Sequence, residues 1–156
     1  MKRLLSIATP VAVIAAAAIV TASGDASIAG RTSTMRVDFK MTSVKIVDAE
    51  PKGDSAGDFG VVVGDLMSHA NGKKIGRYQG TCFTMTSASN SECTFTWSLP
   101  AGQITTISAY GKGFNGEDVV HDAVVGGTHA YRNARGEGIG RETGDGTGTQ
   151  TFHLTR

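Results

Sequence analysis

The sequence predicts an all-β protein, specifically a closed antiparallel up-and-down β-barrel of about eight strands. Three observations favour this fold class: apolar and polar residues alternate over many short segments, turn signals separate these segments, and 21 of the 156 residues are glycine, about twice the usual share. Glycine-rich strands suit a strongly curved sheet, and no segment of useful length shows the apolar period of a helix. A two-sheet sandwich is the alternative, but closure removes strand edges that this chain protects with few charges.

The N-terminal segment has the pattern of a secretory signal peptide. A basic start at Lys2 and Arg3 precedes an uncharged stretch whose apolar centre is residues 11–20. Small residues that suit a signal peptidase end at Ala22, and Ala29 offers a second position. A permanent membrane anchor is the alternative, but a span prefers about 18 or more apolar residues. We therefore expect residues 1–22 to be removed, the mature chain to be secreted and no stable membrane span to remain.

The mature chain is expected to contain a flexible lead-in at residues 23–33 and one barrel domain at residues 34–156. The whole chain has 15 Lys and Arg against 14 Asp and Glu, so loss of Lys2 and Arg3 leaves 13 against 14, a net charge of −1. A nearly neutral chain has no electrostatic footprint for nucleic acid or for an anionic membrane. We therefore expect neither as a partner.

Strand segments follow one another at short spacing. The first, at residues 35–46, alternates apolar and polar residues, and its apolar parity changes between Met41 and Val44, which predicts a β-bulge near Thr42 and Ser43. Further strands are predicted at residues 59–69, 73–86, 92–99, 103–114, 117–125, 136–143 and 149–154. Between them lie a polar loop at residues 50–58 and turn signals that include Asn71-Gly72, Pro100-Ala101-Gly102 and Asn115-Gly116.

A corner is predicted at residues 123–138, which read A-V-V-G-G-T-H-A-Y-R-N-A-R-G-E-G. The pair Gly126-Gly127 permits positive φ at little steric cost and ends the preceding strand. Only residues 128–134 have room for a helical turn. Tyr131 is expected to pin this corner, together with Arg132 and Arg135, whose guanidinium groups suit nearby carbonyl or carboxylate oxygens.

The corner motif G-G-T-x-A-Y-R-x-A-R-G resembles the corner shared by allene oxide cyclase-like and dirigent-like barrels, although that family usually has a glycine where this chain has His129. Other pieces occur in the family's order and at similar spacing, so the resemblance covers nearly all of the chain from Asp48 onward. They are Gly57-Asp58, Gly72 to Gly76, Gly80-Thr81-Cys82, Leu99 to Ile104 and Thr151 to Leu154. The chain is most similar to the small secreted bacterial branch of this group.

The resemblance implies a barrel that works without cofactor or metal and often assembles as a trimer or dimer. In plant cyclases of the group, a glutamate on the first strand is thought to assist ring closure of a substrate held in an apolar cavity. The equivalent positions here are near Ser43, Val44 and Lys45, none of which is acidic. No catalytic residue is therefore assigned.

Candidate cavity residues come from two sources. By the resemblance, Tyr110 matches an aromatic residue that lines the family's cavity. By alternation, Gly60, Val62, Gly64 and Leu66 share one strand face, and if this face points inward its glycines leave room for a small apolar ligand. The structural alternatives are a core aromatic for Tyr110 and strand curvature for the two glycines.

The two cysteines, Cys82 and Cys93, flank a polar turn, and a hairpin centred there places them opposite each other. We predict a cross-strand disulfide, with two buried thiols as the alternative. The four histidines have no metal-ligand spacing, so no metal site is predicted. Two functions remain open: a barrel that binds a small apolar molecule and catalyses a cofactor-independent isomerisation or cyclisation, or a non-catalytic secreted ligand-binding or interaction module.

Overall fold

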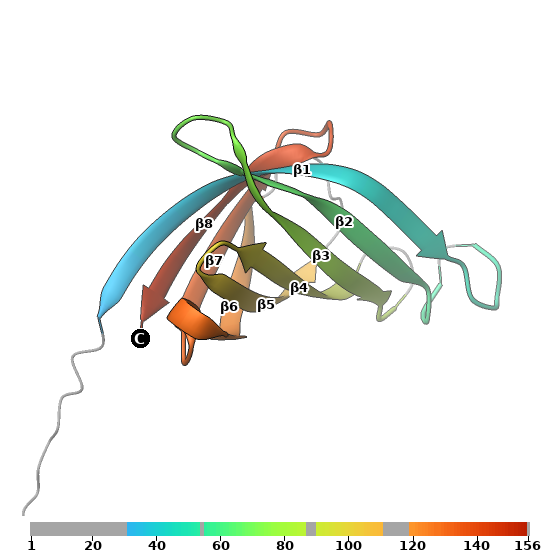
Figure 1. Cartoon of the computed structure of the whole chain (residues 1–156). Coiled ribbons are helices and arrows are strands. Elements are labelled where there is room, and N and C mark those ends of the chain that lie inside the picture. The colour runs from blue at the N-terminus through green and yellow to red at the C-terminus, as the bar shows by residue number, and fades with distance from the viewer. Residues whose placement is uncertain (1–30, 54, 87–89, 111–118, 156) are drawn as a thin grey trace, which may run out of the picture.

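The computed structural model describes residues 31–53, 55–86, 90–110 and 119–155. Eight strands in chain order form one closed barrel, in which each strand is antiparallel to the next and β8 pairs with β1 (Figure 1). The predicted fold class is therefore confirmed. The strands are β1 (Thr32–Val47), β2 (Phe59–Ser68), β3 (Lys74–Thr84), β4 (Ser91–Leu99), β5 (Gly102–Tyr110), β6 (Val119–Gly127), β7 (Arg135–Glu142) and β8 (Thr147–Thr155).

The expected signal peptide, residues 1–22, lies outside the described residues, as do most of the lead-in and the Asn115-Gly116 turn. In the part of the chain that the structure describes, no helix has the length and apolar character needed to cross a membrane.

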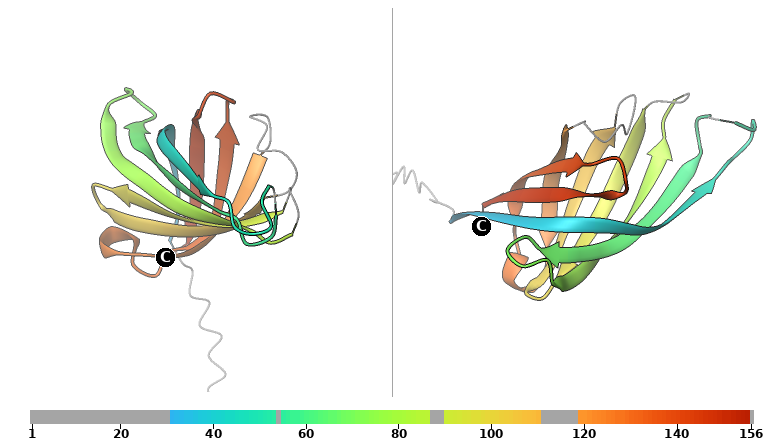
Figure 2. Two further views of the ribbon diagram at one scale, coloured as in Figure 1. Left: turned by 90° about the vertical axis from the view of Figure 1, so that its right-hand side faces the viewer. Right: turned by 90° about the horizontal axis from the view of Figure 1, so that it is seen from above.

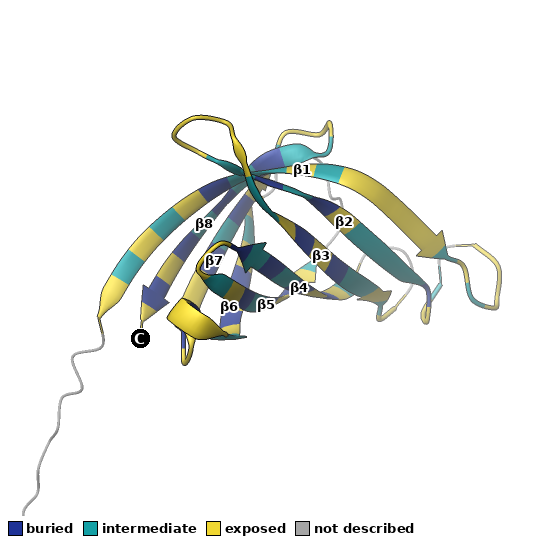
Figure 3. Cartoon of the chain, viewed as in Figure 1, coloured by how far each residue is buried: buried dark blue, intermediate teal, exposed yellow. Residues whose placement is uncertain are grey.

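The long first strand, β1, closes the barrel because it pairs with β2 on one side and with β8 on the other. Val37 is opposite Ser68 of β2 on one side and opposite Gln150 of β8 on the other. The register shifts between Met41 and Ser43, which confirms the predicted β-bulge. Beyond the bulge, β1 is mostly exposed, as its yellow C-terminal half shows (Figure 3).

One end of the barrel is filled with apolar side chains. Six inward residues from five strands are at most 3% exposed there: Val37, Leu66, Ile104, Val124, Phe152 and Leu154. The predicted corner covers this end, and its 3-10 helix η1 (His129–Tyr131) is the short helical turn for which the sequence had room. Apolar burial of this kind stabilises the fold by about 25 cal/mol per Å² of area removed from water.

The corner depends on close backbone contact and on one buried ring. A Cβ atom at Gly127 would lie 2.5 Å from the Tyr131 carbonyl oxygen and 2.6 Å from that of Gln103, so only glycine fits. Tyr131 is buried, and its hydroxyl donates to Met35 Sδ at 3.5 Å. Arg135 Nη1 donates to the Ala134 carbonyl at 2.8 Å.

Two other corner residues are exposed, Arg132 and His129. His129 has a φ of 51°, in the left-handed region that glycine adopts most readily. His129 therefore adopts a conformation that glycine would adopt at lower cost.

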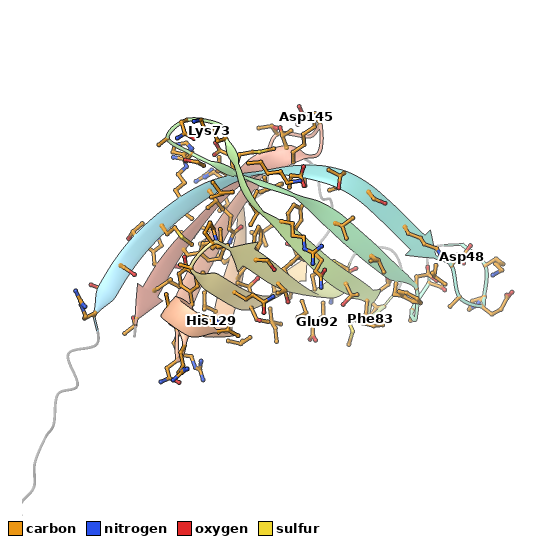
Figure 4. All side chains as sticks on the ribbon, in the orientation of Figure 1. Asp48, Lys73, Phe83, Glu92, His129 and Asp145 are labelled. Carbon is orange, nitrogen blue, oxygen red and sulfur yellow. A yellow bond between two sulfur atoms is a disulfide. The ribbon has the colours of Figure 1, made fainter. Side chains whose placement is uncertain are left out.

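The two ends of the barrel differ in what closes them. Asp48, in the loop between β1 and β2, and His129, in the corner, lie at opposite ends of the molecule (Figure 4). The β1–β2 hairpin extends away from the rest of the barrel at the Asp48 end, as the views from the side and from above show (Figure 2). The filled core lies toward the corner, which leaves the Asp48 end for the cavity.

Candidate functional site

A cavity of about 930 Å³ lies inside the barrel at the end away from the corner. Its lining comes from all eight strands and from the β1–β2 loop, where Asp48 and Asp58 are at its edge. Asp58 closes this loop on itself, because its carboxylate accepts hydrogen bonds from the backbone N–H groups of Ala49 at 2.8 Å and Ser55 at 2.9 Å. These hydrogen bonds hold the pKa of Asp58 below its ordinary value, so the charged form is favoured.

Aromatic rings form one side of the cavity. Trp97 on β4 and Tyr78 on β3 are stacked with ring centres 5.2 Å apart. Phe39 on β1 and Tyr78 form a T-shaped pair with ring centres 5.6 Å apart. Phe95 and Tyr110 continue this side with ring centres 6.4 Å apart. Trp97 is held in place by its Nε1–H, which donates to the buried Thr106 hydroxyl at 3.0 Å. A wall of this kind favours flat apolar ligands, which stack on rings.

The residues proposed from sequence are placed at two levels of the barrel. Gly60, Val62 and Tyr110 line the cavity. Leu66 is fully buried in the core below it, and Gly64 is buried against the Tyr78 ring, where any Cβ atom would overlap that ring and the Lys40 carbonyl. Gly64 thus gives space to a neighbouring side chain, whereas a Cβ at Gly60 would meet nothing within 4 Å. Ligand contact by these residues stays a prediction.

Buried polar groups form the opposite side of the interior. Gln150 on β8 lines the cavity, and its Nε2 donates to Asp122 Oδ2 on β6 at 2.7 Å, with both residues at most 3% exposed. Burial raises the pKa of Asp122, although Ser108, Gln150 and His121 each act to lower it. Ser108 is close enough to affect Asp122, but the Ser108 hydroxyl and Asp122 Oδ1 both lack a partner with hydrogen-bond geometry among the described residues.

Glu142, the last residue of β7, brings a carboxyl group to the cavity. Its Oε2 atom is buried and accepts no hydrogen bond from any residue that the structure describes. Burial raises the pKa of Glu142, and the nearby negative charge of Asp145 raises it further. Asp145 itself stays ionised because the hydroxyl groups of Thr147 and Thr143 lower its pKa to about 2.

Two tyrosines near Glu142 remain neutral phenols. Burial, with a smaller contribution from the Glu142 charge, raises the pKa of Tyr78 to about 12. Burial also raises the pKa of Tyr110, to which the charge of Asp122 adds. The cavity therefore combines one carboxyl group of raised pKa, Glu142, with phenol groups that stay protonated, and such an arrangement is able to exchange a proton with a bound molecule.

Sequence reasoning missed Glu142 as a cavity group and Asp122 as a buried interior carboxyl group, and it missed the ring wall of Tyr78, Phe95 and Trp97. Strand parity offered a signal for the first two. Glu142 shares its face of β7 with the buried Gly138 and Gly140, and Asp122 shares its face of β6 with buried Val124. Parity alone leaves open which face points inward.

The predicted disulfide joins Cys82 of β3 to Cys93 of β4, which are directly opposite in the register with Cα atoms 4.0 Å apart. No cysteine is free. Cys82 lines the cavity, so the disulfide is part of its wall and fixes two strands that also carry aromatic rings. The alternative of two buried thiols is excluded.

No group of three or more His, Cys, Asp or Glu side chains in the described ranges could hold a metal ion. Two histidines instead pair with single carboxylates near the surface: His69 with Asp38 at 2.7 Å and His121 with Glu137 at 2.6 Å.

No protein-family model matches the chain, and no curated protein matches its sequence. Several solved structures do match. A pyocyanin demethylase is 26% identical, with a TM-score of 0.69 over 79% of this chain and 100% of that one. The pterocarpan synthase dirigent protein PsPTS1 is 18% identical, with a TM-score of 0.59 over 80% of this chain and 93% of that one. The Diels Alderase AbmU from Streptomyces koyangensis is 14% identical, with a TM-score of 0.61 over 84% of this chain and 72% of that one.

These matches span nearly the whole described barrel, and they include a dirigent protein and a cyclase-type enzyme. The chain therefore has the barrel fold of the allene oxide cyclase-like and dirigent-like group, as its sequence predicted.

Proposed function

We propose that this barrel binds a small, flat, apolar molecule in its interior and catalyses a cofactor-independent isomerisation or cyclisation, with Glu142 as the group that exchanges a proton with the substrate. One observation carries the proposal. In a ring-lined cavity of about 930 Å³, Glu142 keeps a buried carboxylate oxygen with no hydrogen-bond partner among the described residues. An unpaired buried acceptor is costly to the fold, and such groups are concentrated at functional sites.

The cavity suits a small-molecule ligand in size and chemistry. Its volume lies in the range of about 300–1,000 Å³ that small-molecule pockets occupy. The stacked pair of Tyr78 and Trp97 offers a flat apolar surface, and Phe95 and Tyr110 extend it. A ligand that lies on these rings would have one edge toward Glu142 and Gln150 on the other side.

Glu142 has the properties of a general acid or base. A carboxyl group with a raised pKa is protonated over a wider pH range than an ordinary glutamate, and so it can both donate and accept a proton near its own pKa. The neutral Tyr78 phenol can donate a hydrogen bond to negative charge that develops on the substrate. In this proposal Glu142 of β7 takes the place of the glutamate that the first strand lacks.

The names of the matching structures support small-molecule chemistry in such a barrel. One acts on pyocyanin, one is a pterocarpan synthase dirigent protein and one is a Diels Alderase. We also propose that the mature chain works after export, because the Cys82–Cys93 disulfide persists in an oxidising compartment. A homo-oligomer, either a trimer or a dimer, remains part of the proposal.

Native mass spectrometry and calorimetric titration with flat aromatic molecules, pyocyanin among them, test binding. Product analysis then tests turnover in the wild type and in Glu142→Gln. The matched control is Glu92→Gln, because Glu92 is exposed on the outer face of β4 and points away from the barrel (Figure 4). We expect Glu142→Gln to bind ligand but to lose about 100-fold or more in rate. Binding without turnover in the wild type would instead favour the non-catalytic ligand-binding module, and no binding would contradict both.

A further inference from the structure

Gln150 offers the cavity a fixed hydrogen-bond acceptor. Its Nε2 is occupied by Asp122 Oδ2 at 2.7 Å, while its Oε1 accepts no hydrogen bond from any described residue. Gln150 lines the cavity although it is only 2% exposed. Because one end of the amide is held, the other end has a defined direction and does not adapt to a ligand that fails to match it.

Two glycines of β7 make room for this amide. A Cβ atom at Gly138 would lie 2.5 Å from Gln150 Nε2, and a Cβ atom at Gly140 would lie 2.9 Å from Gln150 Oε1. Gly140 also lines the cavity, so Oε1 lies beside a surface that a ligand can reach. Each half of the amide thus has a glycine opposite it, and any larger residue at Gly138 would displace the Gln150–Asp122 pair.

The assignment of the two amide atoms follows from the partners of Asp122. Asp122 faces Ser108 and Tyr110 of β5 and Gln150 of β8, with His121 beside it on β6. Gln150 Nε2 donates to Asp122 Oδ2 at 2.7 Å, and this hydrogen bond turns Oε1 the other way, toward Gly140. Asp122 is in this sense a positioning residue for Gln150.

We infer that Gln150 Oε1 is a specificity determinant that selects flat ligands carrying a hydroxyl or N–H donor over otherwise similar ligands that carry none. This inference rests on the proposed function and narrows its substrate class to donor-bearing aromatic molecules such as phenols and aryl amines. A buried acceptor left without a donor is penalised, so the ligand that lacks a donor binds more weakly.

The test compares a naphthol with the corresponding methoxynaphthalene, which has the same ring system but no donor, by calorimetric titration of the folded protein. We expect the wild type to bind the naphthol about tenfold more tightly. Gln150→Met should bind the two ligands equally and should hold the methoxy compound at least as tightly as the wild type does. Glu142→Gln should keep the preference, because the glutamate is not the selecting group.

Gln150→Met leaves Asp122 buried without its partner. The double variant Q150M/D122L is therefore tested beside the single variant, because it replaces both polar side chains with apolar ones of similar size. Equal binding of both ligands by the wild type overturns the inference but leaves the proposed function standing. Preference that persists in the double variant, or that vanishes in Glu142→Gln alone, also overturns it. Binding of neither ligand to the wild type overturns the proposed function and this inference with it.

Discussion

Gln150 and Asp122 form a hydrogen-bonded pair inside the barrel, with 2.7 Å between Nε2 and Oδ2, although neither residue is more than 3% exposed. The pair brings an ionisable group into an interior that is otherwise dominated by aromatic and aliphatic side chains. Burial therefore raises the pKa of Asp122 above 3.8, its ordinary value. The direction of this shift has a consequence for stability that can be measured.

We predict that Asp122→Asn makes the protein more stable at neutral pH. A raised carboxyl pKa means that the folded state binds the proton more tightly than the unfolded state does. The wild type therefore loses stability as the pH rises above the pKa that Asp122 has in the unfolded chain. Asparagine keeps an acceptor for Gln150 but carries no charge. In urea unfolding at about pH 8 the variant should have the higher free energy of unfolding, and at about pH 4 the two free energies should converge. A variant that is less stable at both pH values would contradict this account; exposed Glu92→Gln is the control.

Asp58→Asn should have the opposite pH dependence. Backbone N–H groups of Ser55 and Ala49 lower the pKa of Asp58 in the folded state. Its contribution to stability is therefore present above pH 3.8, the pKa of the unfolded chain, and is lost as the pH falls through the lower pKa of the folded state. We expect the variant to be less stable than the wild type at neutral pH and to approach it in acid. Limited proteolysis of the β1–β2 loop at neutral pH should also accelerate. Equal cleavage of the two proteins would argue against a role for Asp58 in closing the loop.

Two glycines on the same face of β2 should respond differently to one methyl group. Gly64→Ala is expected to destabilise the barrel by about 1–3 kcal/mol, because the new Cβ would overlap the Tyr78 ring and the Lys40 carbonyl. Gly60→Ala is expected to change stability by less than about 1 kcal/mol, because its Cβ would meet nothing within 4 Å. Chemical unfolding of both variants measures the difference. Similar losses would mean that the interior beside Gly60 is filled.

The Cys82–Cys93 disulfide should contribute about 3 kcal/mol to stability, from the chain entropy of a loop with a sequence separation of 11. The double variant Cys82→Ala with Cys93→Ala removes it without leaving a free thiol. We expect a lower urea midpoint and weaker ligand binding, because the disulfide is part of the cavity wall. An unchanged midpoint would show that β3 and β4 need no covalent link.

The sequence predicted the features that depend on neighbouring residues. Alternation revealed the strands and the bulge after Met41, and a polar turn between two cysteines revealed the disulfide. The candidate site was less accessible, because it depends on contacts between distant strands. Gly64 looked like free space from its own strand, but the Tyr78 ring of β3 occupies that space. Glu142 is a single acidic residue at a strand end, and only barrel closure brings it to the same cavity as Trp97.

The central claim is that a flat molecule binds inside the barrel, and Trp97 can report it because it is the only tryptophan of the chain and lines the cavity. The most direct measurement is a titration of Trp97 fluorescence with flat aromatic molecules including pyocyanin, corrected for ligand absorbance, on the wild type, on Gly60→Phe and on Val63→Phe. The first variant fills the cavity, whereas Val63 is exposed on the outer face of β2. We predict saturable quenching in the wild type and in Val63→Phe, and its loss in Gly60→Phe. No saturable change in the wild type, or the same titration curve for Gly60→Phe, would contradict the claim.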